Sequence, residues 1–339
     1  MFEVDADIRK AKTLAAEFYT DPRNFEMSTE RIFARSWQFL GKADDAENLR
    51  PAVILPGFLD EPVLLAKGDD GLRCLSNVCT HRGKILVEDA CEARLIRCGY
   101  HGRRFSLDGK FLSMPEFEGV EDFPSETENL RSLPFEVRQG FMFASIAPSV
   151  SFADLVGDVT ASFADDRYND LTFKGTKSYQ VDAHWALYCE NYLEGFHIPY
   201  VHQALNEIVD YGSYTTELFR YSSLQTGYGG AGTVAARYLF LFPNTMFNFY
   251  PWGVSVNVVR PVSPSKSVVE FLTYVGDESL IADSAGADLH GVELEDEAVV
   301  ESVQKGIRSR FYSHGRYSPT REQGTHHFHR LIAEFMNNE

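Results

Sequence analysis

The sequence predicts an α+β fold in which a small all-β unit stands between helical segments and is followed by a larger unit of helices and strands. Three patterns support this prediction: short apolar runs between Gly, Pro and Asp clusters over about residues 37–147, period-2 alternation over 252–260, and apolar residues at helical spacing over 293–312 and 321–336. With 339 residues, the chain is long enough for two or three domains.

Two short helices are expected before the β unit. Over residues 5–19, apolar positions such as Leu14 and Phe18 stand among charged residues, which is typical of an amphipathic helix. A second helix is expected over 28–36, with Ser28 as its N-cap.

The second half of the chain is expected to alternate helices with strands. Helical character is expected near 151–170, a strand over 176–184 and a helix over 185–198. Two strands are expected over 252–260 and 268–275, because valines alternate with Ser and Asn in the first of them. The connection between these strands is expected over Pro261–Ser267, and the helices over 293–312 and 321–336 then complete this half.

The composition is acidic. Lys and Arg number 32 and Asp and Glu number 49, so the formal net charge is −17, which argues against nucleic acid or an anionic membrane as a partner. No apolar run approaches the roughly 20 residues of a membrane span. The acidic segment Met1–Asp5 also lacks the pattern of a signal peptide. We therefore expect a cytoplasmic location and no membrane partner.

Two Cys-His pairs form the first candidate metal site. Cys79-Thr80-His81 is followed, after sixteen residues, by Cys98-Gly99-Tyr100-His101. Zinc also accepts two Cys and two His, but zinc fingers usually keep the two cysteines together. Here each pair supplies one Cys and one His, which suits a [2Fe–2S] cluster in which one iron takes both thiolates and the other takes both imidazoles. The other cysteines are expected to be buried free thiols: Cys74, Cys91 and Cys189.

These two segments resemble the Rieske iron–sulfur motif. Cys79–Gly83 and Cys98–Gly102 match its two halves, and Arg103–Gly109 is similar to the segment that follows the motif in Rieske oxygenases. The resemblance implies that a [2Fe–2S] cluster is bound by Cys79, His81, Cys98 and His101.

A second candidate metal site lies within residues 191–202. Asn191, Glu194 and His197 are three residues apart and fall near one face of a regular helix, whereas His202 is five residues beyond His197. Pro199 is expected to break or bend the helix and to bring His202 round. Two histidines and one carboxylate, with open positions opposite, form the Fe(II) site of non-haem oxygenases.

The carboxylate is expected in the acidic stretch 292–304, which by itself is typical of a solvated helix N-terminus. Glu295-Asp296, with Val303-Gln304 after it, resembles the helix that carries the third iron ligand in Rieske oxygenases. The resemblance therefore implies Asp296 as the ligand, with Glu295 as the alternative and Glu293 as a weaker one.

From Arg35-Ser36-Trp37-Gln38 to His326-His327-Phe328-His329, the chain resembles the catalytic α subunit of Rieske non-haem iron oxygenases. The resemblance implies a helical segment over 1–37 that packs on the catalytic domain, an all-β Rieske domain over 38–148, and a catalytic domain over 149–339 with a helix-flanked antiparallel sheet.

The same resemblance implies a homotrimer in which the cluster of one subunit faces the iron of its neighbour. Glu194 then matches the carboxylate that bridges His101 of one subunit and His197 of the next, and Asn191 matches a residue close to the iron. The chain contains no Gly-rich flavin or nicotinamide motif. We therefore expect O₂ as co-substrate and electrons from NAD(P)H through a separate reductase or ferredoxin.

The substrate prediction depends on a narrower resemblance. Glu rather than Asp at position 194, the Glu-Gly-Phe-His run that it begins, and Glu301–Gly306 resemble the branch that oxidises choline, betaine and carnitine. This implies a monooxygenase that hydroxylates a small quaternary or tertiary amine, removes a methyl group from it or cleaves its C–N bond.

Aromatic side chains supply candidates for binding such a cation, because an aromatic face attracts a cation by about 0.5–2 kcal/mol. The aromatic segment Phe242–Trp252 contains the candidates Phe247, Phe249, Tyr250 and Trp252, although aromatic residues that alternate on a strand are also typical of a core.

Two alternatives remain open at this point. One is a mono- or dioxygenase that acts on an aromatic ring or aromatic acid. The other is a Rieske electron carrier, which needs only the first metal site. A carrier would hold two irons per chain and an oxygenase three, so the iron content distinguishes them.

Overall fold

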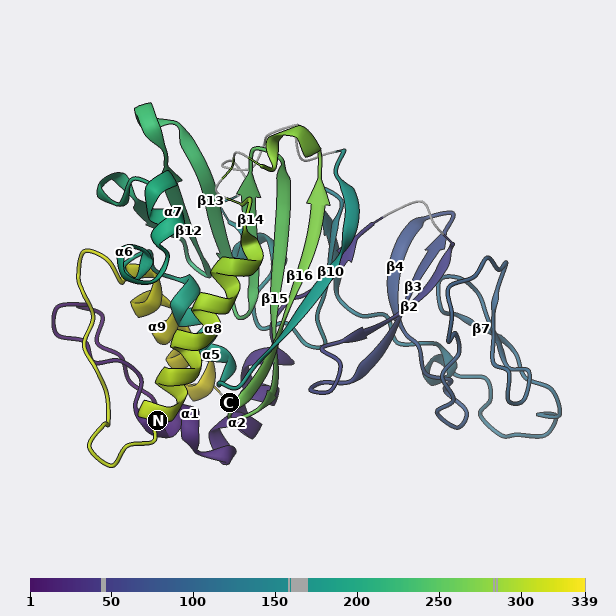
Figure 1. Ribbon diagram of the computed structural model, residues 1–339. Coiled ribbons are helices and arrows are strands. Elements are labelled where there is room, and N and C mark those ends of the chain that lie inside the picture. The colour runs from purple at the N-terminus through teal and green to yellow at the C-terminus, as the bar shows by residue number, and fades with distance from the viewer. Residues whose placement is uncertain (44–46, 158, 160–169, 283, 285, 339) are drawn as a thin grey trace. The chain divides into compact units, whose positions relative to one another are not determined.

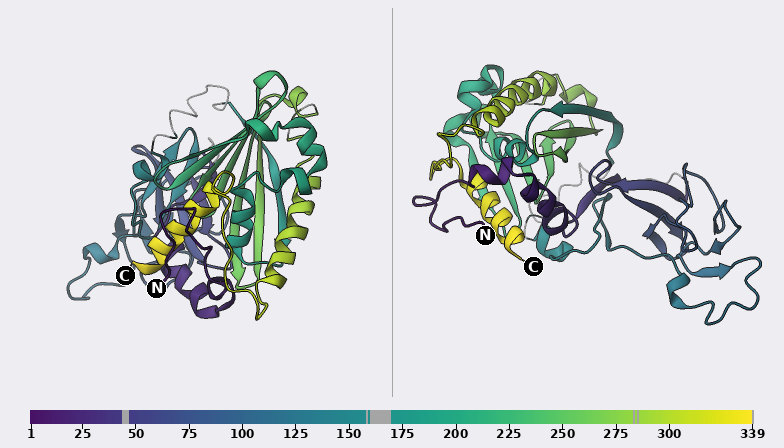
Figure 2. Two further views of the ribbon diagram at one scale, coloured as in Figure 1. Left: turned by 90° about the vertical axis from the view of Figure 1, so that its left-hand side faces the viewer. Right: turned by 90° about the horizontal axis from the view of Figure 1, so that it is seen from below.

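The computed structural model describes residues 1–43, 47–157, 159, 170–282, 284 and 286–338. The chain divides into two compact units. One unit consists of Met1–Ser36 and Val150–Glu339, and the other of Trp37–Ser149. Figures 1 and 2 show the helices and strands of both units.

A seven-stranded antiparallel sheet forms the centre of the first unit (Figure 1). Its strand order is β10-β16-β15-β14-β13-β12-β11. The strands are β10 (Thr172–Val181), β11 (Thr215–Leu218), β12 (Ser222–Tyr228), β13 (Val234–Leu241), β14 (Thr245–Tyr250), β15 (Gly253–Ser263) and β16 (Lys266–Val275).

The two strands predicted near residues 252–275 are present, but the connection predicted over 261–267 is wrong. Ser263 already pairs with Lys266, so the turn between β15 and β16 is tight. The strands β11 to β14 were not predicted. All six residues of β14 are buried, which removes the alternation of apolar and polar residues by which a half-buried strand is recognised.

Three longer helices pack around this sheet (Figure 1). They are α5 (Trp185–Tyr192), α8 (Leu289–Gly306) and α9 (Gln323–Asn337). Helix α5 contacts both other helices and β15, while α8 contacts the edge strand β10 and α9 contacts the opposite edge strand β11. The helix predicted over 185–198 therefore ends six residues early. The other two predicted helices are present with shifted ends.

The N-terminal helices differ from the prediction. Only α1 (Ala16–Thr20) lies in the segment predicted as a helix over 5–19, and α2 (Pro22–Ser28) begins behind an N-cap formed by Asp21. The N-cap prediction for Ser28 is also wrong. Ser28 ends α2, and its hydroxyl donates to the carbonyl of Phe25 at 2.6 Å. A π-helical turn, η1 (Thr29–Phe33), follows.

Shorter helices complete the first unit. Helix α3 (Phe152–Val156) accounts for the start of the helical character expected near 151–170, and residues 160–169 of that prediction lie outside the described residues. The others are α6 (Ile198–Val201), α7 (Gln203–Ile208), η4 (Tyr211–Ser213), η5 (Gly230–Gly232) and η6 (Glu278–Leu280).

The second unit contains three small antiparallel sheets, with strand orders β1-β9-β8, β2-β3-β4 and β5-β6-β7. One 3-10 turn, η2 (Glu126–Glu128), precedes β8. The strands are β1 (Gln38–Lys42), β2 (Leu49–Ile54), β3 (Glu61–Gly68), β4 (Gly71–Ser76), β5 (Ile96–Arg97), β6 (Arg104–Phe105), β7 (Phe111–Ser113), β8 (Phe135–Arg138) and β9 (Phe141–Ala144).

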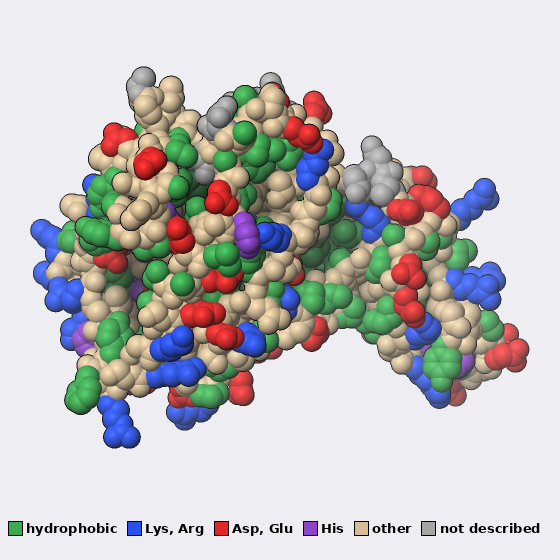
Figure 3. All heavy atoms as spheres, viewed as in Figure 1, with side chains coloured by type: hydrophobic (Ala, Val, Ile, Leu, Met, Phe, Trp, Pro, Cys, Tyr) green, Lys and Arg blue, Asp and Glu red, His purple; other side chains and the backbone are tan. Residues whose placement is uncertain are grey.

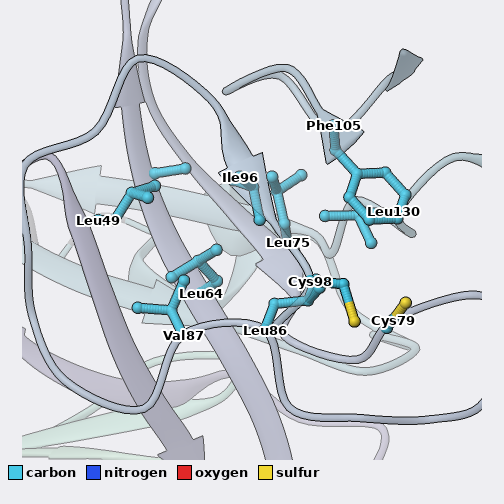
Figure 4. Close-up of a cluster of buried hydrophobic side chains, with 11 residues drawn as sticks. Leu49, Leu64, Leu75, Cys79, Leu86, Val87, Ile96, Cys98, Phe105 and Leu130 are labelled. Atoms are coloured by element: carbon cyan, nitrogen blue, oxygen red, sulfur yellow. The ribbon is translucent and has the colours of Figure 1, made fainter. Parts of the chain in front are cut away.

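A compact apolar cluster lies inside the second unit (Figure 4). Leu64, Leu75, Ile96 and Phe105 are fully buried in it, and the thiols of two cysteines belong to the same cluster. The described cysteines are all free thiols; Cys74 and Cys189 are buried as expected, whereas Cys91 is exposed.

The predicted fold class, an all-β unit combined with a helix-flanked antiparallel sheet, is confirmed. Acidic and basic side chains are interspersed over the face of the molecule shown in Figure 3. Among the described residues, no helix combines the length and the apolar character that crossing a membrane requires.

Candidate functional site

The two Cys-His segments form equivalent turns in the second unit. The N–H of Cys79 donates to the carbonyl of Lys84 at 2.8 Å, and the N–H of Cys98 donates to the carbonyl of Arg103 at 2.8 Å. Each turn contains a glycine in the left-handed region, with φ of +71° at Gly83 and +75° in the second turn, where a side chain would be strained.

These turns bring the four predicted cluster ligands together. Cys79 and Cys98 are 3% and 2% exposed, and their sulfur atoms lie at one end of the apolar cluster (Figure 4). The rings of His81 and His101 have centroids 4.9 Å apart, and His101 is exposed. A pair of buried thiols and a pair of adjacent imidazoles suit a cluster with thiolates on one iron and imidazoles on the other.

A partly buried ion pair ties the two turns together. Arg103 is 1% exposed, pairs with the carboxylate of Glu128 and stacks 4.7 Å from the ring centroid of Phe111. The carbonyl of Glu128 accepts the hydroxyl of Thr80 at 2.9 Å. Glu128 therefore contacts both turns. This role was not predictable from the sequence, because Arg103 and Glu128 are far apart in the chain.

The second group of predicted ligands converges in the first unit. His197 and His202 flank the short helix α6, and Asp296 lies on α8. The prediction that Pro199 breaks the helix is wrong, because α5 already ends at Tyr192 and Pro199 lies in the first turn of α6. Oδ1 of Asp296 is 3.0 Å from Nε2 of His202 and 3.6 Å from Nε2 of His197. Ligand atoms of these three residues lie within 4.8 Å of one another, so they can bind one metal ion.

The other ring nitrogen of each histidine faces a second carboxylate. Nδ1 of His197 is 2.7 Å from Oε1 of Glu194, and Nδ1 of His202 is 2.7 Å from Oε2 of Glu295. A carboxylate at Nδ1 holds a proton there and leaves the lone pair of Nε2 for a metal ion. The donor set of His197, His202 and Asp296 therefore fits a mononuclear Fe(II) site. Glu194 and Glu295 orient its two imidazoles.

Electrostatics at His202 agree with a cation in this place. Burial lowers the pKa of His202, but hydrogen bonds and Coulombic attraction to Asp296 and Glu295 outweigh burial, and the pKa is raised. The same carboxylates favour any positive charge at Nε2, whether a proton or a metal ion.

Asn191 and Glu194, the two predicted catalytic residues, both contact the triad. Nδ2 of Asn191 donates to Oδ1 of Asp296 at 2.8 Å. Helix α5 ends at Tyr192, so Glu194 and His197 lie in the turn after the helix. Oε2 of Glu194 accepts the N–H of His197 at 3.1 Å in this turn.

A cavity of about 110 Å³ adjoins the triad and contains six aromatic side chains in its wall. The rings of Tyr192 and Tyr238 meet edge to face at 6.3 Å, and those of Tyr238 and Tyr250 at 6.2 Å. The remaining aromatic residues of the wall are Tyr188, Tyr214 and Phe271.

Only one of the four predicted aromatic substrate residues lines this cavity. Tyr250 does so, together with Asn248 two residues before it. Phe247 stacks on Phe249 at 6.1 Å, and neither lines the cavity, because alternate residues of β14 face opposite sides of the sheet. Trp252 lines a second cavity of about 280 Å³, which shares Phe271 and Leu289 with the first.

Sequence reasoning missed most of the cavity wall, including Tyr188 and Tyr192 on α5. These two tyrosines are four residues apart on one helix, so they lie near the same face as Asn191. Glu293 also lines the cavity and lies three residues before Asp296 on α8, although it was predicted only as a weak alternative ligand. Helical spacing is the signal that groups these side chains.

Comparison with known proteins finds a family match in each of the two units. Residues 36–124 match the family model of the Rieske [2Fe-2S] domain, and residues 231–338 match that of the ring hydroxylating alpha subunit (catalytic domain). The chain is 30% identical over 356 residues to the carnitine monooxygenase oxygenase subunit of Escherichia coli K12, covering 97% of this chain and 95% of that protein. The chain belongs to the Rieske-type oxygenases.

Other relatives of this Rieske-type oxygenase have similar names. The chloroplastic choline monooxygenase of Arabidopsis thaliana is 29% identical over 364 residues, which cover 98% of this chain and 84% of that protein. A solved structure of the quaternary ammonium Rieske monooxygenase CntA with an inhibitor has a TM-score of 0.83 and 26% identity and covers 98% of this chain and 97% of that one.

Naphthalene 1,2-dioxygenase, at 18% identity and a TM-score of 0.76 over 96% of this chain and 92% of that one, shares the fold. The match of residues 231–338 to a catalytic-domain model decides against the electron-carrier alternative, so the oxidoreductase is a terminal oxygenase.

Proposed function

We propose that this terminal oxygenase is a monooxygenase of a small quaternary or tertiary amine. The observation that carries the proposal is the aromatic wall beside the triad, where Tyr192, Tyr238 and Tyr250 form a continuous series of rings. Aromatic faces attract alkylated ammonium groups. The names of the choline and carnitine monooxygenases among its relatives support the same substrate class.

In this proposal, His197, His202 and Asp296 bind Fe(II), and Cys79, His81, Cys98 and His101 bind the [2Fe–2S] cluster. When bound, the mononuclear iron supplies O₂ chemistry and the cluster supplies electrons one at a time.

The protein side chains hold this site in place. Glu194 and Glu295 keep the Nδ1 protons of the two histidines. Asn191 donates to Oδ1 of Asp296 and thereby orients that carboxylate toward both imidazoles. His202 is 2% exposed, so water has little access to it.

The overall reaction balances as a monooxygenation. A C–H bond of the substrate is replaced by a C–O bond, and the second atom of O₂ leaves as water with two electrons and two protons. Where the hydroxylated carbon is bonded to nitrogen, its C–N bond then breaks to give an aldehyde and a shortened amine. NAD(P)H supplies the electrons through a separate reductase or ferredoxin.

We further propose a homotrimer in which Glu194 bridges His197 to His101 of a neighbouring subunit. The exposure of His101 supports this arrangement, since an exposed side chain can contact another chain. A solved structure of a quaternary ammonium Rieske monooxygenase is described as revealing inter-subunit electron transfer; it is 24% identical to this chain. In this assignment the Rieske domain covers residues 38–148, the catalytic domain covers 149–339, and residues 1–37 pack on the latter.

The proposal is tested with iron-loaded protein, a surrogate reductase and NADH. Choline, betaine and carnitine are compared with benzoate, salicylate and phthalate, and products are identified by mass, because uncoupled turnover consumes O₂ without product. An oxidised amine or an aldehyde supports the proposal. A hydroxylated arene from the aromatic acids, with no amine product, contradicts it.

A further inference from the structure

The wall of the cavity beside the triad includes a carboxyl group, that of Glu293, which has no role in the reaction proposed above. Glu293 lies on α8 three residues before Asp296 and is 2% exposed. Its Oε2 accepts the hydroxyl of Tyr188 at 2.5 Å. Its Oε1 is buried without a hydrogen-bond partner among the described residues.

Such a group is costly in a folded protein, because a buried carboxylate without a compensating charge loses its hydration. Burial, opposed by the hydrogen bond from Tyr188 and assisted by repulsion from Asp296 and Glu297, raises the pKa of Glu293 to about 8. A nearby cation would offset the burial and favour the carboxylate.

The charged groups around the cavity include no lysine or arginine partner for Glu293 among the described residues. Its wall includes the carboxyl groups of Glu194, Glu293 and Asp296. Glu194 and Asp296 each face an imidazole, whereas the hydrogen-bond partner of Glu293 among the described residues is the hydroxyl of Tyr188. Neither lysine nor arginine is among the described residues that line this cavity.

The neutral polar side chains of the cavity wall suit an uncharged polar group on the substrate. Asn248 and Asn257 line the cavity with the tyrosines. Oδ1 of Asn248 accepts the hydroxyl of Tyr192 at 2.9 Å, so the amide group of Asn248 is held in a fixed orientation. Amide and phenol groups can hydrogen-bond a substrate hydroxyl, but they cannot neutralise a substrate carboxylate.

We infer that Glu293 is the counter-charge for the ammonium group of the substrate and that the rest of the substrate carries no negative charge. The preferred substrate is therefore an amino alcohol of the choline type and not a carboxylate-bearing betaine or carnitine. This inference rests on the proposed function, and it assigns to Glu293 a specificity that the aromatic rings alone do not provide.

The test uses equilibrium binding to the iron-loaded protein, measured calorimetrically without reductase, and initial rates with reductase. The ligands are choline, its uncharged carbon isostere 3,3-dimethylbutan-1-ol, and the zwitterion glycine betaine. The variant is Glu293→Gln, which keeps an acceptor for Tyr188 and removes the charge. Glu301→Gln is the matched control, because it removes one charge from the same helix outside the cavity and keeps an acceptor for the N–H of Asp182.

We expect the wild-type protein to bind choline at least about tenfold more tightly than the isostere and than betaine. In Glu293→Gln, the preference for choline over the isostere falls about tenfold or more, with the effect in Kd and KM larger than that in kcat. Binding of the isostere and the iron content stay unchanged, and Glu301→Gln behaves as wild type.

The outcomes separate the inference from the proposed function. Equal binding of betaine and choline would overturn the claim that the substrate carries no negative charge. An undiminished preference for choline over the isostere in Glu293→Gln would overturn the role of Glu293 as the counter-charge. Both results leave an amine oxygenase intact. Failure of every methylated amine to bind or react overturns the proposed function, and the inference with it.

Discussion

Oε1 of Glu194 lies 2.7 Å from Nδ1 of His197, and Oε2 of the same carboxylate accepts the backbone N–H of His197 at 3.1 Å. One side chain therefore fixes both the ring and the backbone of a proposed iron ligand. A carboxylate in this position orients the ligand and sets its tautomer, and such partners are usually needed for full activity.

We predict that Glu194→Gln leaves both metal centres occupied but nearly abolishes turnover, because the amide retains the size of the side chain and loses the charge that holds the Nδ1 proton. Iron content, the visible spectrum of the cluster and product formation measure these effects. Turnover at the wild-type rate would contradict the bridging role.

The geometry also predicts different roles for two adjacent carboxylates. Asp296→Asn is expected to lose the mononuclear iron and retain the two cluster irons, because Oδ1 of Asp296 faces both Nε2 atoms. Glu295→Gln is expected to keep this iron with about 10–100-fold weaker affinity, since Glu295 lies at Nδ1 of His202 and not at the metal-facing Nε2. Iron stoichiometry under increasing chelator concentration measures both. The reverse order of effects would make Glu295 the ligand.

Gly195 is predicted to tolerate no side chain. A Cβ at this position would stand 2.8 Å from the ring of Tyr214, so the turn that carries Glu194 and His197 would have to move. We expect Gly195→Ala to cost about 1–3 kcal/mol of stability and to weaken iron binding. Gly230→Ala is the control, because its Cβ meets nothing within 4 Å, and it should change stability by less than about 0.5 kcal/mol. Urea unfolding and iron content test both variants.

The ion pair between Arg103 and Glu128 is predicted to support the cluster turns. Arg103→Met leaves a carboxylate without its partner, and we expect a loss of about 3–5 kcal/mol in the stability of the second unit. Arg104→Met, the neighbouring exposed arginine of β6, is the control. Thermal bleaching of the cluster absorbance measures the effect. Equal midpoints for the two variants would show that the pair contributes nothing.

Stability is predicted to fall with acidification because of His184. Burial lowers the pKa of His184 to about 3, and Phe18 and Tyr19 pack on its ring at 5.2 and 5.5 Å. The unfolded chain therefore binds a proton that the folded chain excludes, and stability that is complete above pH about 6.5 is lost as the pH falls toward 3.

The contribution of His184 is at most about 1.4 kcal/mol per pH unit. Urea unfolding between pH 7.5 and 5.5 should show a steeper dependence on pH in the wild type than in His184→Asn, which retains a side chain that caps α5. Identical slopes in the two proteins would rule out His184 as a source of the acid sensitivity.

Some helices could be predicted from the sequence and others could not. The helices over 293–312 and 321–336 were predictable because one face of each is apolar, and α8 and α9 are present there. The segment 5–19 has similar spacing, but Asp21 and Pro22 start a separate helix and leave only Ala16–Thr20 helical before them. Spacing indicates a possible helix, whereas its ends depend on capping and on tertiary contacts.

In the candidate site, the metal ligands could be predicted from the sequence but the residues of the cavity wall could not. Metal-ligand types at short spacing are local in the sequence, and the Cys-His turns and the segment from Asn191 to His202 were predictable for that reason. The aromatic segment Phe242–Trp252 indicated substrate residues, but only the register of β14 decides which rings face the cavity.

The sequence by itself predicted the fold class, the family and the candidate metal ligands other than the carboxylate, because each depends on motif residues at short spacings or on periodic apolar patterns. Only the tertiary structure decided that Asp296 faces both imidazoles while Glu295 faces Nδ1 of His202, and that Glu293 lines the cavity. These relationships join α5, α6 and α8 across about a hundred residues of chain. Their geometry comes from how the helices pack on the sheet, and no local pattern of residues encodes it.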